Sequence, residues 1–144
     1  MSDKIVHFLP LSHHHEGEHY RCVLMPLGKK RRLALCARCL TFYPTLALVL
    51  GLQIAFDIGP AGVVDWWIAL ALAAPAVIDW GIGRLRHRGR NSIRLLTGAL
   101  LGVALGRSLL LYFREPTNEI FWVQAGLVVM SALAFEGVRR LELD

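Results

Sequence analysis

Residues 36–58 read CARCLTFYPTLALVLGLQIAFDI, so a pair of cysteines runs directly into an apolar segment. The apolar part, 40–58, has 19 residues. A helix rises about 1.5 Å per residue, so this segment would cover roughly the ~30 Å hydrocarbon core of a bilayer. The stretch therefore predicts where an N-terminal segment, 1–39, meets a first membrane-spanning helix.

Three further apolar segments follow. The second span, 63–82, contains Pro75, which we expect to kink the helix. The third and fourth spans are 93–113 and 119–138, and a short tail, 139–144, closes the chain. Apolar residues make up 55% of the sequence, charged residues 19%, and the mean hydropathy is +0.47. These observations predict an all-α membrane protein with four transmembrane helices.

Basic residues are gathered in alternate connecting segments. They lie before the first span, between spans two and three, and in the tail, whereas the other two loops hold only Arg114 beside acidic residues. Basic residues stay cytoplasmic, so both termini are predicted to be inside. A soluble helical bundle, the alternative, would make this alternation a coincidence. Residues 1–18 have no apolar core of signal-peptide length, so no cleaved leader is expected. The basic residues are Lys29, Lys30, Arg31, Arg32, Arg38, Arg84, Arg86, Arg88, Arg90, Arg139 and Arg140.

Three cysteines and a histidine are spaced as metal ligands. His19-x2-Cys22 and Cys36-x2-Cys39 are two close pairs joined by 13 residues. Zinc takes four such ligands in tetrahedral geometry, and it would stabilise a segment too short and polar to build its own core. We therefore predict a cytoplasmic zinc-binding cap held by Cys22, Cys36, Cys39 and His19. The alternatives to His19 as fourth ligand are His13, His14 and His15.

Two other interpretations of the cysteines remain open. In a reducing compartment, a close cysteine pair is typical of either a metal site or a thiol redox pair. The redox interpretation lacks the following helix of a βαβ unit. In the second interpretation, the cysteines are small apolar side chains packed at an interface.

Polar residues inside the spans form two groups. Such residues are costly in a membrane and are usually paired or functional. We expect Asp79, Arg94, Thr97 and Glu136 to converge just below the cysteines. Toward the other side, Asp65 and Arg107 could pair, with Gln53 and Gln124 at a similar depth. The alternative is that both groups are structural ion pairs near the interfaces, with snorkelling arginines.

The candidate catalytic or binding residues are taken from the inner group and the basic loop beside it. They form a rim that would attract an anionic headgroup or a phosphate, because arginine offers paired donors to such groups. The candidates are Asp79, Arg90, Asn91 and Arg94.

Three glycines of the third span fall four residues apart, on one helix face. Gly98, Gly102 and Gly106 form a repeated small-xxx-small pattern, which lets another helix backbone approach closely. We expect this face to pack against a sibling helix, a partner subunit or a second copy of the chain.

Two stretches resemble the domain-of-unknown-function 2085 family. The first is Cys22-x3-Pro26 with Cys36-Ala37-Arg38-Cys39 and Tyr43, and together the two cover residues 19–106. The resemblance implies a small prokaryotic multi-pass protein of the cytoplasmic membrane, with no assigned reaction. Val23 stands where the family has a histidine, so His19 would be a relocated ligand. The second stretch comprises Asp79, Asn91, Arg94, Thr97, Gly98 and Gly102.

Two functional hypotheses follow. The first is an integral membrane protein with a cytoplasmic zinc knuckle, acting as a structural or accessory subunit of a membrane complex. The second is a membrane enzyme or carrier acting on an anionic lipid or small anion, with Asp79 as acid or base and Arg90 and Arg94 holding the phosphate. The lipid bilayer is the expected partner. Nucleic acid is not expected, because the orientation rule already explains the basic runs. No P-loop, dinucleotide-binding, kinase or Ser-His-Asp signature is present.

Overall fold

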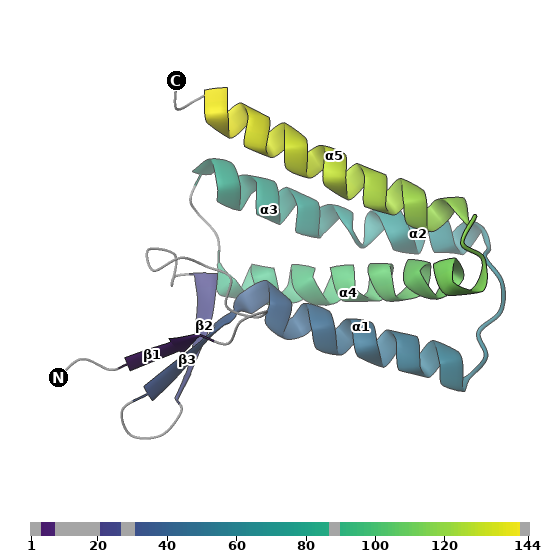
Figure 1. Cartoon of the computed structure of the whole chain (residues 1–144), viewed down its shortest axis with the longest axis horizontal. Helices are drawn as coiled ribbons and strands as arrows, with labels where there is room; N and C mark the ends of the chain where they lie inside the picture. Colours follow the sequence, from purple (N-terminus) through teal and green to yellow (C-terminus); the bar gives the residue numbers. More distant parts are fainter. Residues whose placement is uncertain (1–3, 8–20, 27–30, 87–89, 142–144) are drawn as a thin grey trace.

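The structure, a computed structural model, describes residues 4–7, 21–26, 31–86 and 90–141 (Figure 1). Within these ranges, four stretches are long and apolar enough to cross a membrane, namely Ala37–Ala55, Val63–Gly83, Asn91–Arg114 and Glu119–Val138. The predicted number of spans is therefore confirmed. The helices are α1 (Ala37–Ala55), α2 (Val63–Ala71), α3 (Ala74–Arg86), α4 (Asn91–Arg114) and α5 (Glu119–Leu141).

The second span is broken rather than only kinked. Helix α2 ends at Ala71 and α3 begins at Ala74, so Pro75 lies in the first turn of α3. Proline has no backbone N–H and is tolerated in a first turn, where that group would have no helical partner. The carbonyl of Ala73 accepts from the amides of Ala76 and Val77 at 3.1 and 3.2 Å. Pro75 therefore lies at an irregularity of the second span, as predicted, but the span is divided into two helices rather than bent as one.

A three-stranded sheet precedes the helices, so the all-α prediction is wrong for the cap. The strands are β1 (Lys4–His7), β2 (Cys22–Pro26) and β3 (Arg31–Cys36). In the order β1-β3-β2, β1 runs parallel and β2 antiparallel to β3. The last three residues of β3 are all buried, so the strand lacks the alternation that marks a half-buried strand in a sequence. Such short strands, without alternation, leave a weak local signal in the sequence.

Helix α4 is the centre of the helical domain. Half of its most apolar window is buried, against 11% for α1 and α5. In Figure 1 it lies between α1 on one side and the α2–α3 pair on the other. The cysteine end, our name for the end of the domain that carries Cys36, Gly83 and Asn91, is where the sheet joins the helices. Helix α5 ends on that same side.

The glycine face of α4 packs against α1. A Cβ atom at Gly98 would lie 2.5 Å from the Arg38 carbonyl oxygen, and one at Gly102 would lie 2.8 Å from that of Phe42. Only glycine allows the two backbones to come this close. The predicted close approach is therefore confirmed, with a sibling helix. Because α1 occupies this face, the predicted contact with a partner subunit or second copy does not use it.

Candidate functional site

The cysteine pair lies at a junction between a strand and a helix. Cys36 is the last residue of β3 and the N-cap of α1, and Cys39 lies in the first turn of that helix. Helix α1 thus begins at Ala37, three residues before the predicted span. The helix that follows the motif is the predicted membrane span, which continues directly from the strand.

The three cysteines are neighbours. Cys22 lies directly opposite Cys36 in the antiparallel pairing of β2 and β3. The Cys39 thiol is hydrogen-bonded to Cys36 and lies close enough to Cys22 for an electrostatic interaction. None of the three forms a disulfide, and Cys22 and Cys36 are buried. The sheet register and the helix start therefore gather residues that are far apart in the sequence.

The predicted zinc site stays a prediction. His19 and its alternatives, His13, His14 and His15, lie outside the described residues. Across the ranges that the structure describes, no three Cys, His, Asp or Glu side chains form a group that could hold a metal. The thiols have the right chemistry for zinc, but their side chains do not by themselves form a site.

A cavity of about 130 Å³ opens beside the thiols. Three of its lining residues are arginines, and they come from different elements: Arg21 precedes β2, Arg38 is in α1 and Arg94 is in α4. Among the lining residues that the structure describes, Asp79 is the one carboxylate beside the three arginines. The full lining is Arg21, Cys36, Arg38, Cys39, Asp79, Trp80, Gly83 and Arg94.

Arg38 is the residue that connects the cysteine motif to the inner acid. Its Nη2 forms an ion pair with Asp79, and the two side chains are only 21% and 10% exposed. Its Nε is buried and has no hydrogen-bond partner among the residues that the structure describes. A buried donor without an acceptor costs free energy, so this atom marks a place where a ligand oxygen would be stabilised.

The other two arginines are anchored at the edges of the cavity. Arg21 donates to the carbonyl of Gly83 at 2.9 Å. Arg94 is 5% exposed and donates to the side chain of Asn91 at 3.4 Å. Asn91 in turn donates to the carbonyl of Cys22 at 3.1 Å. This chain of contacts ties α3 and α4 to the cap.

The predicted inner group is confirmed in part. Asp79 and Arg94 line the cavity, and Thr97 lies 3.5 Å from the Asp79 carboxylate. Asn91 supports Arg94. Arg90, however, does not line the cavity. It is the N-cap of α4, before the first helical residue, and its side chain is exposed.

Glu136 does not join the cavity lining either. It forms an ion pair with Arg140, one turn further along α5, at 3.8 Å. Arg21 and Arg38 line the cavity in place of Arg90 and Glu136. The sequence pattern indicates Arg38 only as a basic residue of the cap, and it gives no indication for Arg21. The signal for Arg38 was its position between the two cysteines, at the start of a helix.

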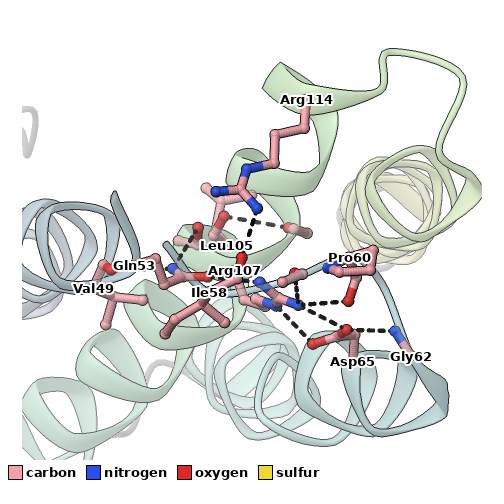
Figure 2. A network of polar contacts seen from close by, with 12 residues as sticks. Val49, Gln53, Ile58, Pro60, Gly62, Asp65, Leu105, Arg107 and Arg114 are labelled. Atoms are coloured by element: carbon pink, nitrogen blue, oxygen red, sulfur yellow. Dashed lines mark hydrogen bonds and ion pairs between the residues drawn. The ribbon is translucent and has the colours of Figure 1, made fainter. Parts of the chain in front are cut away.

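At the opposite end, the predicted pair of Asp65 and Arg107 is confirmed (Figure 2). Arg107 donates from Nε and Nη2 to the two carboxylate oxygens of Asp65, at 2.7 and 3.0 Å. Its other contacts are the Gln53 side chain and the carbonyls of Gly59 and Pro60, at 3.2 to 3.4 Å. Its charge is balanced and its donors are used, so the network has a structural role, closing the loop between α1 and α2.

Gln124 belongs to a separate contact. It accepts from Ser108 of α4 and donates to the carbonyl of Ala69 at 2.9 Å, joining α5 to α4 and α2. Both polar side chains are buried. Gln124 therefore lies on the side predicted for it, and its side chain contacts Ser108 and Ala69.

Comparison with known proteins identifies a family but no individual relative. The family model described as "Predicted membrane protein (DUF2085)" matches residues 26–107, more than half of the 144-residue chain. The matched range includes the cysteine pair, Asp79, Arg94 and the glycines of α4. No curated protein and no solved structure matches the chain.

Proposed function

The chain belongs to the DUF2085 family of predicted membrane proteins, and we propose that it binds an anionic group, such as a phosphate, in the arginine-lined cavity at the cysteine end. The observation that supports this most directly is Arg38, whose Nε is buried without a partner while its Nη2 is paired with Asp79. A shift of the Arg38 side chain would bring that Nε, which is buried in this structure, within reach of an anion oxygen in the cavity.

The charge of the cavity favours the same ligand. Three guanidinium groups from different elements line this small cavity, so an anion in it would meet several positively charged donors. Arginine is also the side chain best suited to phosphate, because its planar group offers several fixed donors.

The zinc knuckle is a second candidate, favoured by the opposition of Cys22 and Cys36 and by the contact of Cys36 with Cys39. With His19 as fourth ligand, these thiols would hold a metal that ties β2, β3 and α1 together. A structural or accessory role in a membrane complex goes with this proposal. The two candidates are compatible, since the anion uses the arginines and the metal uses the thiols.

We also propose that the cysteine end faces the cytoplasm of a prokaryotic cell. The described basic residues at the cap, at the end of α3, at the start of α4 and at the end of α5 support this, because cytoplasmic flanks carry the excess of lysine and arginine. At the opposite end, the described loops carry Arg114 beside Asp57, Glu115 and Glu119. Lys29, Lys30 and Arg88 contribute to the pattern but lie outside the described residues.

A phosphate titration tests the anion site. Trp80 lines the cavity, whereas the other three tryptophans are at positions 66, 67 and 122, so a Trp66→Phe/Trp67→Phe/Trp122→Phe protein reports from Trp80 alone. We expect inorganic phosphate to change its emission in a saturable way. Loss of a hydrogen bond to a charged group costs about 1.5–3 kcal/mol, so Arg38→Gln should weaken binding by roughly 10- to 100-fold.

Two further variants control the charge change. Arg38→Lys keeps the charge that faces Asp79 but has no Nε, so it should bind phosphate with an affinity between those of the native protein and Arg38→Gln. Arg140→Gln removes an arginine that is exposed on α5 and should leave binding unchanged. No saturable response, or the same response in Arg38→Gln and Arg140→Gln, would contradict the proposal.

A further inference from the structure

We infer that the anion is the headgroup of a lipid, and that one hydrocarbon chain of this lipid lies in an apolar groove between α3, α4 and α5. This inference rests on the proposed anion site and adds the chemical class of its ligand. It is carried by a second hollow that shares two lining residues with the cavity.

The groove has a volume of about 240 Å³. Apart from Arg38, its lining is apolar: three residues come from α3, one from α4 and two from α5. Val128 is 37% exposed, so the groove is open on the α5 side rather than sealed. The lining residues are Arg38, Ala76, Val77, Trp80, Leu101, Val128 and Ala132.

The groove and the cavity meet at Arg38 and Trp80. Both residues line both hollows, and they lie where the cavity with its positive charge gives way to the apolar helix surfaces. The Trp80 ring is held by an edge-on contact with Phe135 of α5, with centroids 5.7 Å apart. A ligand that fills both hollows therefore has an anionic end beside Arg38 and an apolar part on the far side of Trp80.

The size of the groove points to a hydrocarbon chain rather than to a helix. An engineered protein cavity of about 150 Å³ holds a benzene molecule, so the groove accommodates a segment of an acyl chain. A helix with its side chains is roughly 10 Å across and needs more room. A free phosphate, in contrast, would leave the groove unused.

The headgroup decides which lipid binds. Lipid chains are as apolar as the groove, so occupancy by the chain alone distinguishes little between lipids. The charge near Arg38 does distinguish them, because each basic residue near a membrane surface contributes about 1 kcal/mol toward an anionic lipid, or roughly fivefold. The site is therefore expected to select an anionic phospholipid over a zwitterionic one.

Quenching of Trp80 by brominated acyl chains tests this inference. The protein with Trp80 as its only tryptophan is placed in phosphatidylcholine nanodiscs that contain a low, equal fraction of brominated phosphatidylglycerol or brominated phosphatidylcholine. We expect quenching by brominated phosphatidylglycerol to indicate about fivefold higher occupancy of the groove than quenching by brominated phosphatidylcholine. In Arg38→Gln, quenching by brominated phosphatidylglycerol should fall to that by brominated phosphatidylcholine.

The groove is tested by filling it. Ala132→Phe should lower quenching by both lipids, and Val128→Phe, at a more exposed position, provides a second variant if Ala132→Phe does not fold. The matched control is Val129→Phe, because Val129 is exposed and does not line the groove. Equal effects of Ala132→Phe, Val128→Phe and Val129→Phe on quenching would contradict the groove as the chain site.

The phosphate titration, carried out alongside the quenching experiment, separates this inference from the proposed function. If inorganic phosphate binds in an Arg38-dependent way but the two brominated lipids quench equally, the anion site stands and the lipid inference fails. If neither phosphate nor phosphatidylglycerol responds to Arg38→Gln, both fail. Selective quenching by phosphatidylglycerol that depends on Arg38 and on the groove supports both.

Discussion

Arg38, in the first turn of α1, forms an ion pair with Asp79 of α3, 41 positions further along the chain. The pair fixes the cysteine motif against the second span. The pair uses Nη2 of the guanidinium group, while Nε stays buried with no partner in the described part of the chain. The same side chain therefore holds two elements together and offers a donor to the cavity.

Asp79→Asn separates these two roles. The variant loses the charge that compensates Arg38, so we expect the free energy of unfolding to fall by about 1–3 kcal/mol. It also removes the one negative charge in the cavity lining, so phosphate affinity should rise by about 1 kcal/mol, or roughly fivefold. Thermal unfolding with and without phosphate measures both effects. Asp57→Asn, at an exposed position at the opposite end, is the control. A fall in both stability and phosphate affinity would argue against an anion site.

The buried pair of Asp65 and Arg107 should make a large contribution to stability. Removing one partner leaves a charge inside the membrane domain, so Asp65→Asn or Arg107→Gln should each cost about 3–5 kcal/mol. The double variant should be more stable than either single variant, because no uncompensated charge remains. Denaturant unfolding in detergent gives these values. Arg114→Gln, from the exposed pair with Asp57, should change stability by less than about 1 kcal/mol. Additive costs in the double variant would show that the residues are not coupled.

The contact of α4 with α1 predicts a difference between two glycine-to-alanine changes. In Gly98→Ala, the new methyl group would meet the Arg38 carbonyl oxygen at 2.5 Å and the Thr41 hydroxyl at 2.6 Å. The helices must separate, at a cost of about 1–3 kcal/mol. Gly126→Ala, on α5, meets nothing within 4 Å and should be neutral or slightly stabilising. Equal melting temperatures for the two variants would contradict the packing described for α1 and α4.

The zinc prediction is checked by elemental analysis of the purified protein. A knuckle formed by His19 and the three cysteines should contain zinc in a fixed ratio to protein, and Cys36→Ser should lose it. His19→Ala identifies the fourth ligand, because unchanged zinc content in this variant would remove His19 from the site. If the native protein contains no zinc and all three thiols react with an alkylating agent in denaturant, the thiols are free and the knuckle interpretation is wrong.

The helical part of the molecule was largely predictable because its signals are local. Apolar length marks the spans, a spacing of four marks the face of Gly98, and Pro75 marks the break in the second span. The pairing of Asp65 with Arg107 also followed, since two opposite charges at one depth in a membrane have few other partners.

The cap and the partner of Asp79 were not predictable in the same way. Strands β2 and β3 are short and their burial does not alternate, so local patterns do not reveal them. Asp79 has Arg84, Arg86 and Arg90 close by in the sequence, yet it pairs with Arg38 from another span. That pairing depends on how α1 and α3 each pack against α4, and no local sequence pattern indicates it.

Isothermal titration calorimetry with inorganic phosphate tests the central claim most directly. The titration uses the purified native protein, Arg38→Gln and Arg140→Gln in a neutral detergent, with chloride at matched ionic strength as the control ligand. The account predicts saturable binding of phosphate to the native protein and to Arg140→Gln, and binding weakened at least about tenfold in Arg38→Gln. Heats for phosphate that match those for chloride, or equal affinities in all three proteins, would contradict it.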